Sequence, residues 1–491
     1  MTTAVTVDAV ISAVPAALIV GRSGERPAAV VDLTHDSRQV GPGWAFACVT
    51  GERSDGHDFA AAAVEAGAVM LLVERTLPLD VPQLVVTDVR RAMGPAAAAV
   101  HGHPAERLTM VGITGTNGKT TTTAMLGSIL RATGRDVRMQ GTLSGARTTP
   151  EAPDLQRQLA EYVDEGVDAV VMEVSSHAMV FHRVAGTHFD VVVFTNLGRD
   201  HLDLHESMEA YFRAKASLFD PALAATGVTN LDDPSGRLIF DAAQIEMRGY
   251  SLADAVDVAV TVDRHSFTWQ GHSVTVPVGG HFNVMNSIAA LTTADVVGVS
   301  PDDAVRGLAT CTTVPGRFET VDDPTRDQIS VVVDYAHTPD GLEALLGSAR
   351  QMLQGGRLVA VFGCAGDRDA EKRAPMGAVG AALADLAIIT SDNPRREDPA
   401  SIIADVLAGV ASSDRAATLT EVDRRTAISL AIGRAQPGDI VVIAGKGHET
   451  TQTIGDDVRP FDDRVVAREF LAELAAGSVD PAPSPLTGGP S

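Results

Sequence analysis

The sequence has few cysteines, a shortage of basic residues and no long apolar run. Its three cysteines, Cys48, Cys311 and Cys364, lie far apart in the chain. They therefore lack the close pairing of zinc sites and disulfide frameworks, and they fit a reducing compartment. Lys and Arg number 39 against 63 Asp and Glu, so the formal net charge is -24. This charge repels nucleic acid and anionic membranes, and an anionic substrate has to be held by local donors such as loop amides and single arginines.

Membrane and export signals are also missing. No apolar run reaches the roughly 18 residues of a membrane span. The apolar stretch 9–20 contains Pro15 and lacks a basic flank, since the first charged residues are Asp8 and Arg22. We therefore expect a cytoplasmic protein without a membrane span or a nucleic-acid partner, and we expect a monomer.

The length of 491 residues is enough for three domains, each with its own core. We place their boundaries at 1–106, 107–318 and 319–477, followed by a tail, 478–491, with the Pro, Gly and Ser content of a disordered end. In the second and third segments, β-branched runs alternate with helical stretches. This alternation predicts an α/β fold with mostly parallel sheets covered by helices.

Polar segments follow directly after the apolar runs of these two domains. The central runs "TMVGI", "DAVVME" and "DVVVF" lead into "TGTNGKTT", "VSSH" and "TNLGRDHLDLH". The later runs "ISVVV", "RLVAVF", "LAIIT" and "IVVIA" lead into "DYAHTPD", "GCAGDRD", "SDNPRRED" and "GKGHE". Because parallel α/β sheets bind ligands beyond the carboxyl ends of their strands, we expect these loops to line binding sites.

The segment "VGITGTNGKTTT" predicts a strand, a glycine-rich loop and a helix that runs to Ala132. Loop amides and Lys119 would hold phosphates, and the Thr120 hydroxyl would reach Mg²⁺. The common phosphate-loop pattern has a glycine where this chain has Ile113, so a glycine-rich turn with an incidental lysine stays open on the pattern alone. Read singly, Glu173 could be a solvated strand end and Lys215 a solvated helix residue.

Taken together, the motifs identify a family. Eight motifs follow one another in this order: "GITGTNGKTT", "MEVSSHAM", "NLGRDHLDLH", "YFRAKASLF", "HFNVMNSIAA", "PGRFE", "DYAHTPDGLE" and "GKGHE". Together they closely resemble the motifs of the Mur ligases, the ATP-dependent amide-forming enzymes of peptidoglycan precursor synthesis. The resemblance covers nearly the whole chain apart from the tail. It implies an N-terminal UDP-binding α/β domain, a central P-loop ATPase-like domain and a C-terminal Rossmann-like domain.

The resemblance also implies roles for single residues in the ATP and metal sites. The lysine matching Lys215 is carbamoylated by CO₂ in this family, which turns a cation into an anion that can help to position Mg²⁺. The implied metal residues are Thr120, Glu173, His201 and the Lys215 carbamate, and the implied catalytic residues are Lys119, Lys215, Glu173, His201 and Arg317. The implied ATP contacts are Gly115, Thr116, Asn117, Gly118, Lys119, Thr120, Thr121, Asn283, Asn286, Arg317 and Asp334.

The N-terminal segment "HDSRQVGPGWAFACVTGERSDGHDF" is similar to the UDP-binding domain of the family member that adds the third residue of the stem peptide. The substrate implied is UDP-N-acetylmuramoyl-L-Ala-D-Glu. Its implied contacts are Ser37, Arg38, Thr148, Thr149, Ser175 and Arg183. Some relatives carry a glutamine where this chain has Phe181.

The incoming amino acid is predicted from "DNPR". In the family, the arginine matching Arg395 marks enzymes that add meso-diaminopimelate, which is lysine with a second carboxylate that a guanidinium can hold in a bidentate manner. The implied contacts are Arg368, Asp392, Asn393, Arg395, Gly445 and Glu449, while we expect Arg396 to be solvated. Alternatives are the same ligase using L-lysine, a folylpolyglutamate synthetase, and a nucleotide-binding scaffold without catalysis.

Overall fold

The computed structural model describes residues 4–23, 29–51, 54–145, 147–321, 329–411 and 416–476. The predicted disordered tail, 478–491, lies outside these ranges, and so does the end of the second linker region. The described chain forms two compact units. The first unit contains residues 1–197, 209–251 and 289–307, and the second contains residues 198–208, 252–288 and 308–491.

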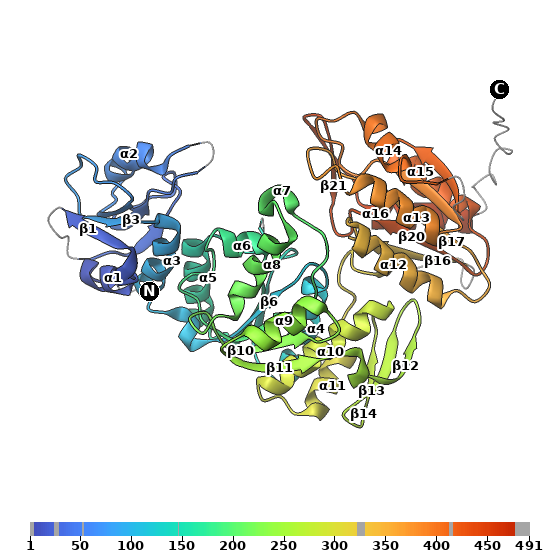
Figure 1. Ribbon diagram of the computed structural model, residues 1–491, viewed down its shortest axis with the longest axis horizontal. Helices are drawn as coiled ribbons and strands as arrows, with labels where there is room; N and C mark the ends of the chain where they lie inside the picture. The colour runs from blue at the N-terminus through green and yellow to red at the C-terminus, as the bar shows by residue number, and fades with distance from the viewer. Residues whose placement is uncertain are drawn as a thin grey trace. The chain divides into compact units, whose positions relative to one another are not determined.

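The first unit begins with a five-stranded sheet (blue in Figure 1). Its order is β1 (Ile19–Ser23), β5 (Gln83–Val86), β4 (Met70–Val73), β3 (Trp44–Ala47) and β2 (Asp32–Thr34). Only β1 runs antiparallel to its neighbour. Helices α1 (Val7–Ala13) and α3 (Val89–Val100) supply side chains to the core beneath this sheet.

The same unit contains a six-stranded parallel sheet. Its order is β11 (Glu246–Tyr250), β10 (Ala224–Asn230), β9 (Phe189–Phe194), β6 (Thr109–Thr114), β8 (Ala169–Glu173) and β7 (Val137–Gln140). The Val-rich central strands are buried along nearly their whole length, as parallel strands covered on both faces are. The loops after β6, β8 and β9 therefore leave three adjacent strands at one edge.

Glycine or proline marks the ends of two helices of the first unit. Helix α4 (Lys119–Ala132) starts after Gly118, which has φ 88°, and ends at Ala132 as the sequence predicted. Helix α5 (Ala152–Glu165) has Pro153 in its first turn and ends at Gly166, which has φ 83°. Helices α3 and α5 pack against each other (Figure 1).

The second unit is built on another six-stranded sheet. Its order is β15 (Glu319–Val321), β16 (Ile329–Asp334), β20 (Asp439–Ala444), β17 (Leu358–Phe362), β18 (Leu386–Thr390) and β19 (Ala417–Glu421), with only β15 antiparallel. Helices α12 (Pro339–Met352), α13 (Arg373–Leu383) and α15 (Arg424–Arg434) contribute to its two hydrophobic cores. A hairpin of β21 (Thr451–Ile454) and β22 (Asp457–Pro460) follows β20.

The second unit also holds a small antiparallel sheet of β12 (Val256–Val260), β13 (His265–Trp269) and β14 (His272–Val276). The fold class predicted from the sequence, α/β with mostly parallel sheets, is confirmed. All seven apolar runs that precede polar motifs are strands, and their motifs follow the carboxyl ends of neighbouring strands.

Candidate active site

The phosphate loop lies between β6 and α4. Gly115 has φ 144°, and a Cβ at this position would collide with Thr195 Oγ1, so glycine is needed here. The loop is held from β9, because Thr116 N donates to Asn196 O at 2.8 Å and Asn117 N donates to Asn196 Oδ1 at 2.9 Å. The amides at the start of α4 and the partial positive charge of its N-terminus make this loop suited to phosphate.

Two lysine ammonium groups meet at this loop. Lys119 Nζ donates to Gly115 O at 2.9 Å and to Thr116 O at 2.8 Å. Lys215, from α8 (Met208–Ala216), is 1 % exposed, and its Nζ donates to the same Gly115 O at 2.7 Å. The Lys215 ammonium also lies 4.5 Å from the centre of the Tyr211 ring. Lys215 is therefore buried beside the phosphate loop, and the reading as a solvated helix residue is wrong.

Glu173 ends β8 and is 1 % exposed, so the reading as a solvated strand end is wrong as well. Its carboxylate accepts hydrogen bonds from Thr142 N at 2.9 Å and Thr142 Oγ1 at 3.2 Å. A Cβ on Gly141 would collide with this carboxylate, so the loop after β7 lies directly on it. The first unit thus holds a buried carboxylate at the end of β8 and a buried amine from α8 beside the loop after the neighbouring strand β6.

Four of the six predicted dipeptide contacts lie close to Glu173 and are connected to it by hydrogen bonds. Thr149 is fully buried, and its hydroxyl donates to Glu173 O at 2.9 Å and accepts from Ser175 N at 3.2 Å. Arg183 donates to Thr149 O at 3.3 Å. Thr148 shares a 3.2 Å hydroxyl contact with Thr142. The structure therefore brings together four of the six predicted dipeptide residues.

The other two, Ser37 and Arg38, lie in the loop after β2. The Arg38 side chain is exposed and donates to both carboxylate oxygens of Asp36, at 2.8 and 2.7 Å. These hydrogen bonds lower the pKa of Asp36 to about 2. Arg38 is therefore charge-paired in this structure, while a guanidinium has five N–H donors, so N–H groups beyond those on Asp36 can serve a substrate.

The second unit holds the remaining predicted nucleotide residues. Asn283 and Asn286 lie on α10 (His281–Val296), and Asn286 Nδ2 donates to Asn283 Oδ1 at 2.8 Å. Asp334 accepts from the backbone N–H groups of Phe318 and Ala336, both at 2.7 Å. Burial raises the pKa of Asp334, although the charge of Arg317 and the backbone hydrogen bonds act in the opposite direction.

In this unit Arg317 lies against an aromatic ring, and His201 lies beside a carboxylate. The Arg317 guanidinium lies 4.3 Å from the centre of the Tyr335 ring. His201 adopts a left-handed backbone conformation with φ 54°, and its Nε2 lies 3.3 Å from Asp200 Oδ2. Among the described residues, no three His, Cys, Asp or Glu side chains are clustered as a ready metal site.

Most of the residues predicted to bind the incoming amino acid lie in the segments after β18 and β20. Asp392 and Asn393 are buried, and Asn393 Nδ2 donates to Glu449 Oε2 at 2.8 Å. A Cβ on Gly445 would lie 2.6 Å from Asp392 Oδ2, which explains why a small residue follows β20. Arg395 has φ 54° and donates from its guanidinium to Gly366 O at 3.1 Å. Arg368 and Arg396 are both exposed, as expected for Arg396.

Two contributors to this site were missed by the sequence analysis. Lys446 is completely buried, and its ammonium donates to Glu449 Oε2 at 3.0 Å, to Asn393 Oδ1 at 3.2 Å and to Thr451 O at 2.7 Å. Strand β21 also supports the "DNPR" loop, since Gln452 donates to Asp392 O and Arg395 N donates to Thr453 O. Lys446 stands inside the quoted motif "GKGHE", which was the available signal. Strand β21 had no comparable motif.

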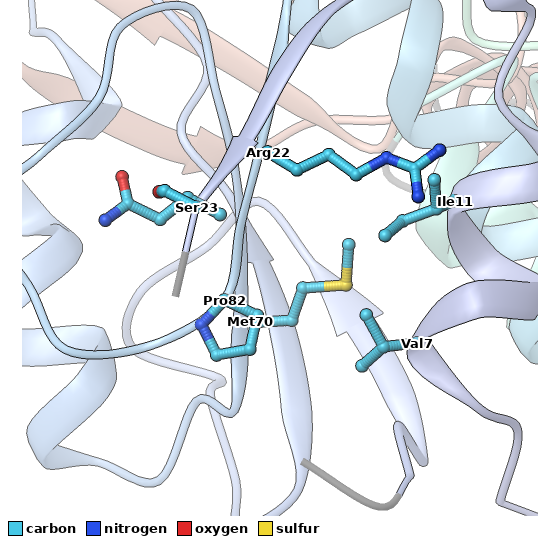
Figure 2. A pocket seen from close by; sticks show the side chains of 7 residues that line it. Val7, Ile11, Arg22, Ser23, Met70 and Pro82 are labelled. Carbon is cyan, nitrogen blue, oxygen red and sulfur yellow. The ribbon is translucent and has the colours of Figure 1, made fainter. Parts of the chain in front are cut away.

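A cavity of about 210 Å³ lies elsewhere, beside β1 in the first sheet (Figure 2). Its lining is mixed: Val7, Ile11, Met70 and Pro82 are apolar, whereas Arg22, Ser23 and Gln83 are polar or charged. None of the predicted site residues lines it. In the described part of the chain, no helix is both long and apolar enough to cross a membrane.

Comparison with known proteins agrees with this arrangement. Three family models match the chain: "Mur ligase family, catalytic domain" over residues 30–102, "Mur ligase middle domain" over residues 113–294, and "Mur ligase, glutamate ligase domain" over residues 316–447. These matches include the phosphate loop, Glu173, Lys215 and the "DNPR" loop.

Curated relatives and a solved structure resemble the chain over nearly its full length. UDP-N-acetylmuramoyl-L-alanyl-D-glutamate--2,6-diaminopimelate ligase of Streptomyces avermitilis is 44 % identical, covering 94 % of this chain and 97 % of that protein. The ligase of the same name from Geobacillus kaustophilus is 44 % identical, covering 90 % and 95 %. A solved structure of a ligase with this name is 33 % identical with a TM-score of 0.68, covering 96 % and 99 %. The chain belongs to the Mur ligase family.

Proposed function

We propose that the chain is an ATP-dependent ligase that adds meso-diaminopimelate to the D-Glu γ-carboxylate of UDP-N-acetylmuramoyl-L-Ala-D-Glu in peptidoglycan precursor synthesis. The observation that carries this proposal is the similarity, over nearly the full length, to ligases named for 2,6-diaminopimelate. It is joined by the phosphate loop, where the ammonium groups of Lys119 and Lys215 both donate to the carbonyl oxygen of Gly115. Amide formation from a carboxylate needs activation, and ATP supplies it as an acyl phosphate.

The reaction begins with transfer of the γ-phosphoryl group of ATP to the γ-carboxylate. One carboxylate oxygen forms the new P–O bond while the bond to the ADP oxygen breaks. Lys119 exchanges its loop carbonyls for phosphate oxygens, and Arg317 adds a second positive charge, because phosphoryl transfer depends on electrostatic stabilisation of the transferring group. The free amine of the amino acid then attacks the acyl carbon and forms the C–N bond. The nitrogen loses one proton to solvent, and the tetrahedral intermediate collapses as the C–O bond to phosphate breaks and phosphate leaves.

ATP is proposed to contact the loop and α4 through Gly115, Thr116, Asn117, Gly118, Lys119, Thr120 and Thr121, and through Asn283, Asn286, Arg317 and Asp334. The buried Asp334 carboxylate suits hydroxyl groups of a ribose, since its backbone partners leave acceptor capacity. The domain division 1–106, 107–318 and 319–477 belongs to the same proposal, with UDP, ATP and the amino acid bound mainly by successive domains.

The residues around Lys215 fit Mg²⁺ only if the lysine is modified. Thr120 and Glu173 offer the oxygen ligands that Mg²⁺ prefers, whereas the Lys215 ammonium would repel a cation. A carbamate formed from the Lys215 amine and CO₂ would replace that positive charge with an anionic oxygen ligand. When bound, Mg²⁺ neutralises phosphate charge. His201 is retained as a metal ligand from the family resemblance.

The proposed substrate contacts follow the two remaining clusters. Ser37, Arg38, Thr148, Thr149, Ser175 and Arg183 would bind the UDP-muramoyl dipeptide. Arg368, Asp392, Asn393, Arg395, Gly445 and Glu449 would bind meso-diaminopimelate. Arg395 is suited to the distal carboxylate, because its backbone is fixed by β21 and its guanidinium is held only by the carbonyl of Gly366 among the contacts described.

L-Lysine is the alternative amino acid, and an unpaired Arg395 disfavours it because lysine brings no anion to this group. A non-catalytic scaffold would not need Lys119, Thr120, Glu173 and Lys215 in one place. A folylpolyglutamate synthetase would not need the UDP-binding segment that contains Ser37 and Arg38.

The test is product formation by the purified chain with ATP, Mg²⁺, UDP-N-acetylmuramoyl-L-Ala-D-Glu and meso-diaminopimelate. ADP release and a product mass equal to the dipeptide plus diaminopimelate minus water are expected, and omission of any one substrate should abolish the product. ADP release without a ligated product would contradict the proposal and favour the scaffold or another ligase.

A further inference from the structure

Three arginines converge on one buried carboxylate in the first unit. Glu151, with a side chain 5 % exposed, lies 2.5 Å from Arg147, 3.0 Å from Arg183 and 3.4 Å from Arg90. One negative charge therefore faces three positive charges in a partly buried place. Such an excess suits an anion that arrives from outside, because each guanidinium retains donors that Glu151 cannot use.

An aromatic ring arranges two of these arginines. The guanidinium of Arg90 lies 5.1 Å from the centre of the Phe181 ring, and that of Arg183 lies 5.6 Å from it. Phe181 has no hydrogen-bonding group of its own, but its ring attracts both cations and limits their motion. The side chain therefore orients guanidinium groups rather than contacting a polar ligand directly.

Close packing of α3 places Arg90 at this ring. Arg90 and Gly94 are four residues apart and share one face of the helix. A Cβ on Gly94 would collide with Ala185 O, and a Cβ on Gly186 would lie 2.6 Å from Gly94 O. The backbone of α3 at Gly94 thus touches the segment after Phe181. Arg90 lies one helical turn before Gly94 on the same face, and its guanidinium therefore reaches the Phe181 ring.

Unsatisfied polar groups support an anion site here. Arg183 Nε is buried without a hydrogen-bond partner, and so is Nδ1 of His35, which lies close enough to Glu151, Arg90 and Arg147 to be influenced by their charges. Burial lowers the pKa of Arg183, and repulsion by Arg147 and Arg90 acts in the same direction although Glu151 opposes it. A second negative charge would relieve this repulsion.

The cluster is linked to Glu173, where the proposed function places the reacting end of the substrate. Arg183 donates to Thr149 O, and the Thr149 hydroxyl donates to Glu173 O, so two hydrogen bonds join the cluster to the proposed metal residue. At that end the substrate carries two carboxylates of D-Glu. The γ-carboxylate reacts, while the α-carboxylate keeps its charge throughout the reaction.

We propose that Arg90, oriented by Phe181 and acting with Arg183, binds the unreactive α-carboxylate of the D-Glu residue. Arg90 is a specificity-determining residue for that carboxylate, supplied by the helix that follows the N-terminal sheet. This inference rests on the proposed function, since it assumes that a muramoyl dipeptide ends in this place.

The test measures binding by isothermal titration with three ligands. These are UDP-N-acetylmuramoyl-L-Ala-D-Glu, its D-isoglutamine analogue, in which only the α-carboxylate is replaced by an amide, and UDP. The variant is Arg90→Met, which keeps an apolar chain against Phe181 and removes the guanidinium. Arg91→Met is the control, because Arg91 is the exposed neighbour on the same helix.

Wild-type protein should bind the D-Glu ligand about 10- to 100-fold more tightly than the isoglutamine analogue, the size of one charge-assisted hydrogen bond. Arg90→Met should lose most of this preference and bind UDP as wild type does, while Arg91→Met should retain the preference. Arg90→Lys should retain part of it, and this variant serves if Arg90→Met does not fold.

Three results would overturn the inference. One is an unchanged preference in Arg90→Met. Another is an equal loss of affinity for all three ligands, which would move the role of Arg90 to the diphosphate. The third is a preference lost equally in Arg91→Met. If wild-type protein binds UDP but not the dipeptide ligand, the proposed function fails as well, and this outcome is distinct from the other three.

Discussion

Breaking the fully buried ion pair between Arg424 and Asp463 should destabilise the second unit much more than breaking the exposed pair between Arg425 and Glu469. Both side chains of the buried pair are 0 % exposed, and the guanidinium donates to Asp463 at 2.8 and 2.7 Å. It also donates to Ser391 O, directly after β18, and to Ala444 O, at the end of β20, beside the proposed amino-acid site. Removing Arg424 leaves a buried carboxylate and two carbonyls without these donors.

The expected cost of Arg424→Met is about 3–5 kcal/mol, because one charge remains buried without its partner. The matched control is Arg425→Met. Arg425 also joins α15 to α16 (Asp463–Ala475), by a 2.6 Å ion pair with Glu469, but both side chains are nearly half exposed. An exposed pair of this kind contributes only about 0–1 kcal/mol.

Thermal unfolding followed by circular dichroism measures the difference. About 2–4 °C per kcal/mol is expected for a unit of this size, so Arg424→Met should lower the transition of the second unit by about 6–20 °C and Arg425→Met by less than about 4 °C. Replacing Arg424 and Asp463 together by Met and Leu should cost less than Arg424→Met alone. Similar small shifts for Arg424→Met and Arg425→Met would refute the reasoning.

Three further predictions concern buried groups of both units. Lys215→Ala should reduce the rate of ligation by at least about 100-fold. Arg213→Ala, on the exposed face of the same helix, should leave the rate nearly unchanged. Equal rates for Lys215→Ala and wild type would show that a Lys215 carbamate is not needed. Lys446→Met should raise the KM for diaminopimelate by about 10-fold with little change in the KM for ATP, because Lys446 orients Glu449. If Lys446 had a purely structural role, the substitution would lower the thermal transition and leave both KM values unchanged. Burial lowers the pKa of His265 from 6.5 to about 4, so the unfolded chain takes up a proton that the folded chain resists as pH falls. The contribution of His265 to the free energy of unfolding is therefore present above pH 6.5 and is lost toward pH 4, by about 2 kcal/mol at pH 5. The urea midpoint of His265→Gln should fall less between pH 7 and pH 5 than the midpoint of the wild type. An equal fall in both proteins would contradict this assignment.

The sequence predicted those parts of the site that are local in the chain. The glycines and Lys119 of the phosphate loop lie within one strand, loop and helix, so the local pattern indicated a phosphate loop, and the other motifs of the chain favoured it over a glycine-rich turn. The polar loops were also placed correctly, since parallel strands bring their carboxyl ends to one edge of the sheet.

Contacts between distant segments could not be predicted in the same way. The burial of Lys215 depends on a contact with Gly115, one hundred residues away. The support of the "DNPR" loop by β21 depends on the pairing of Arg395 with Ile454, which no periodicity in either segment encodes. The arginine cluster at Glu151 requires α3 to pack on the segment after Phe181, and its only local trace is Gly94.

The most direct measurement offers meso-diaminopimelate and L-lysine in parallel to the purified chain, with ATP, Mg²⁺ and UDP-N-acetylmuramoyl-L-Ala-D-Glu, and determines ADP release and product mass. The account predicts a ligated product with meso-diaminopimelate and almost none with lysine, because only the former brings a carboxylate to Arg395. Comparable product with lysine, or product with lysine alone, would contradict the account.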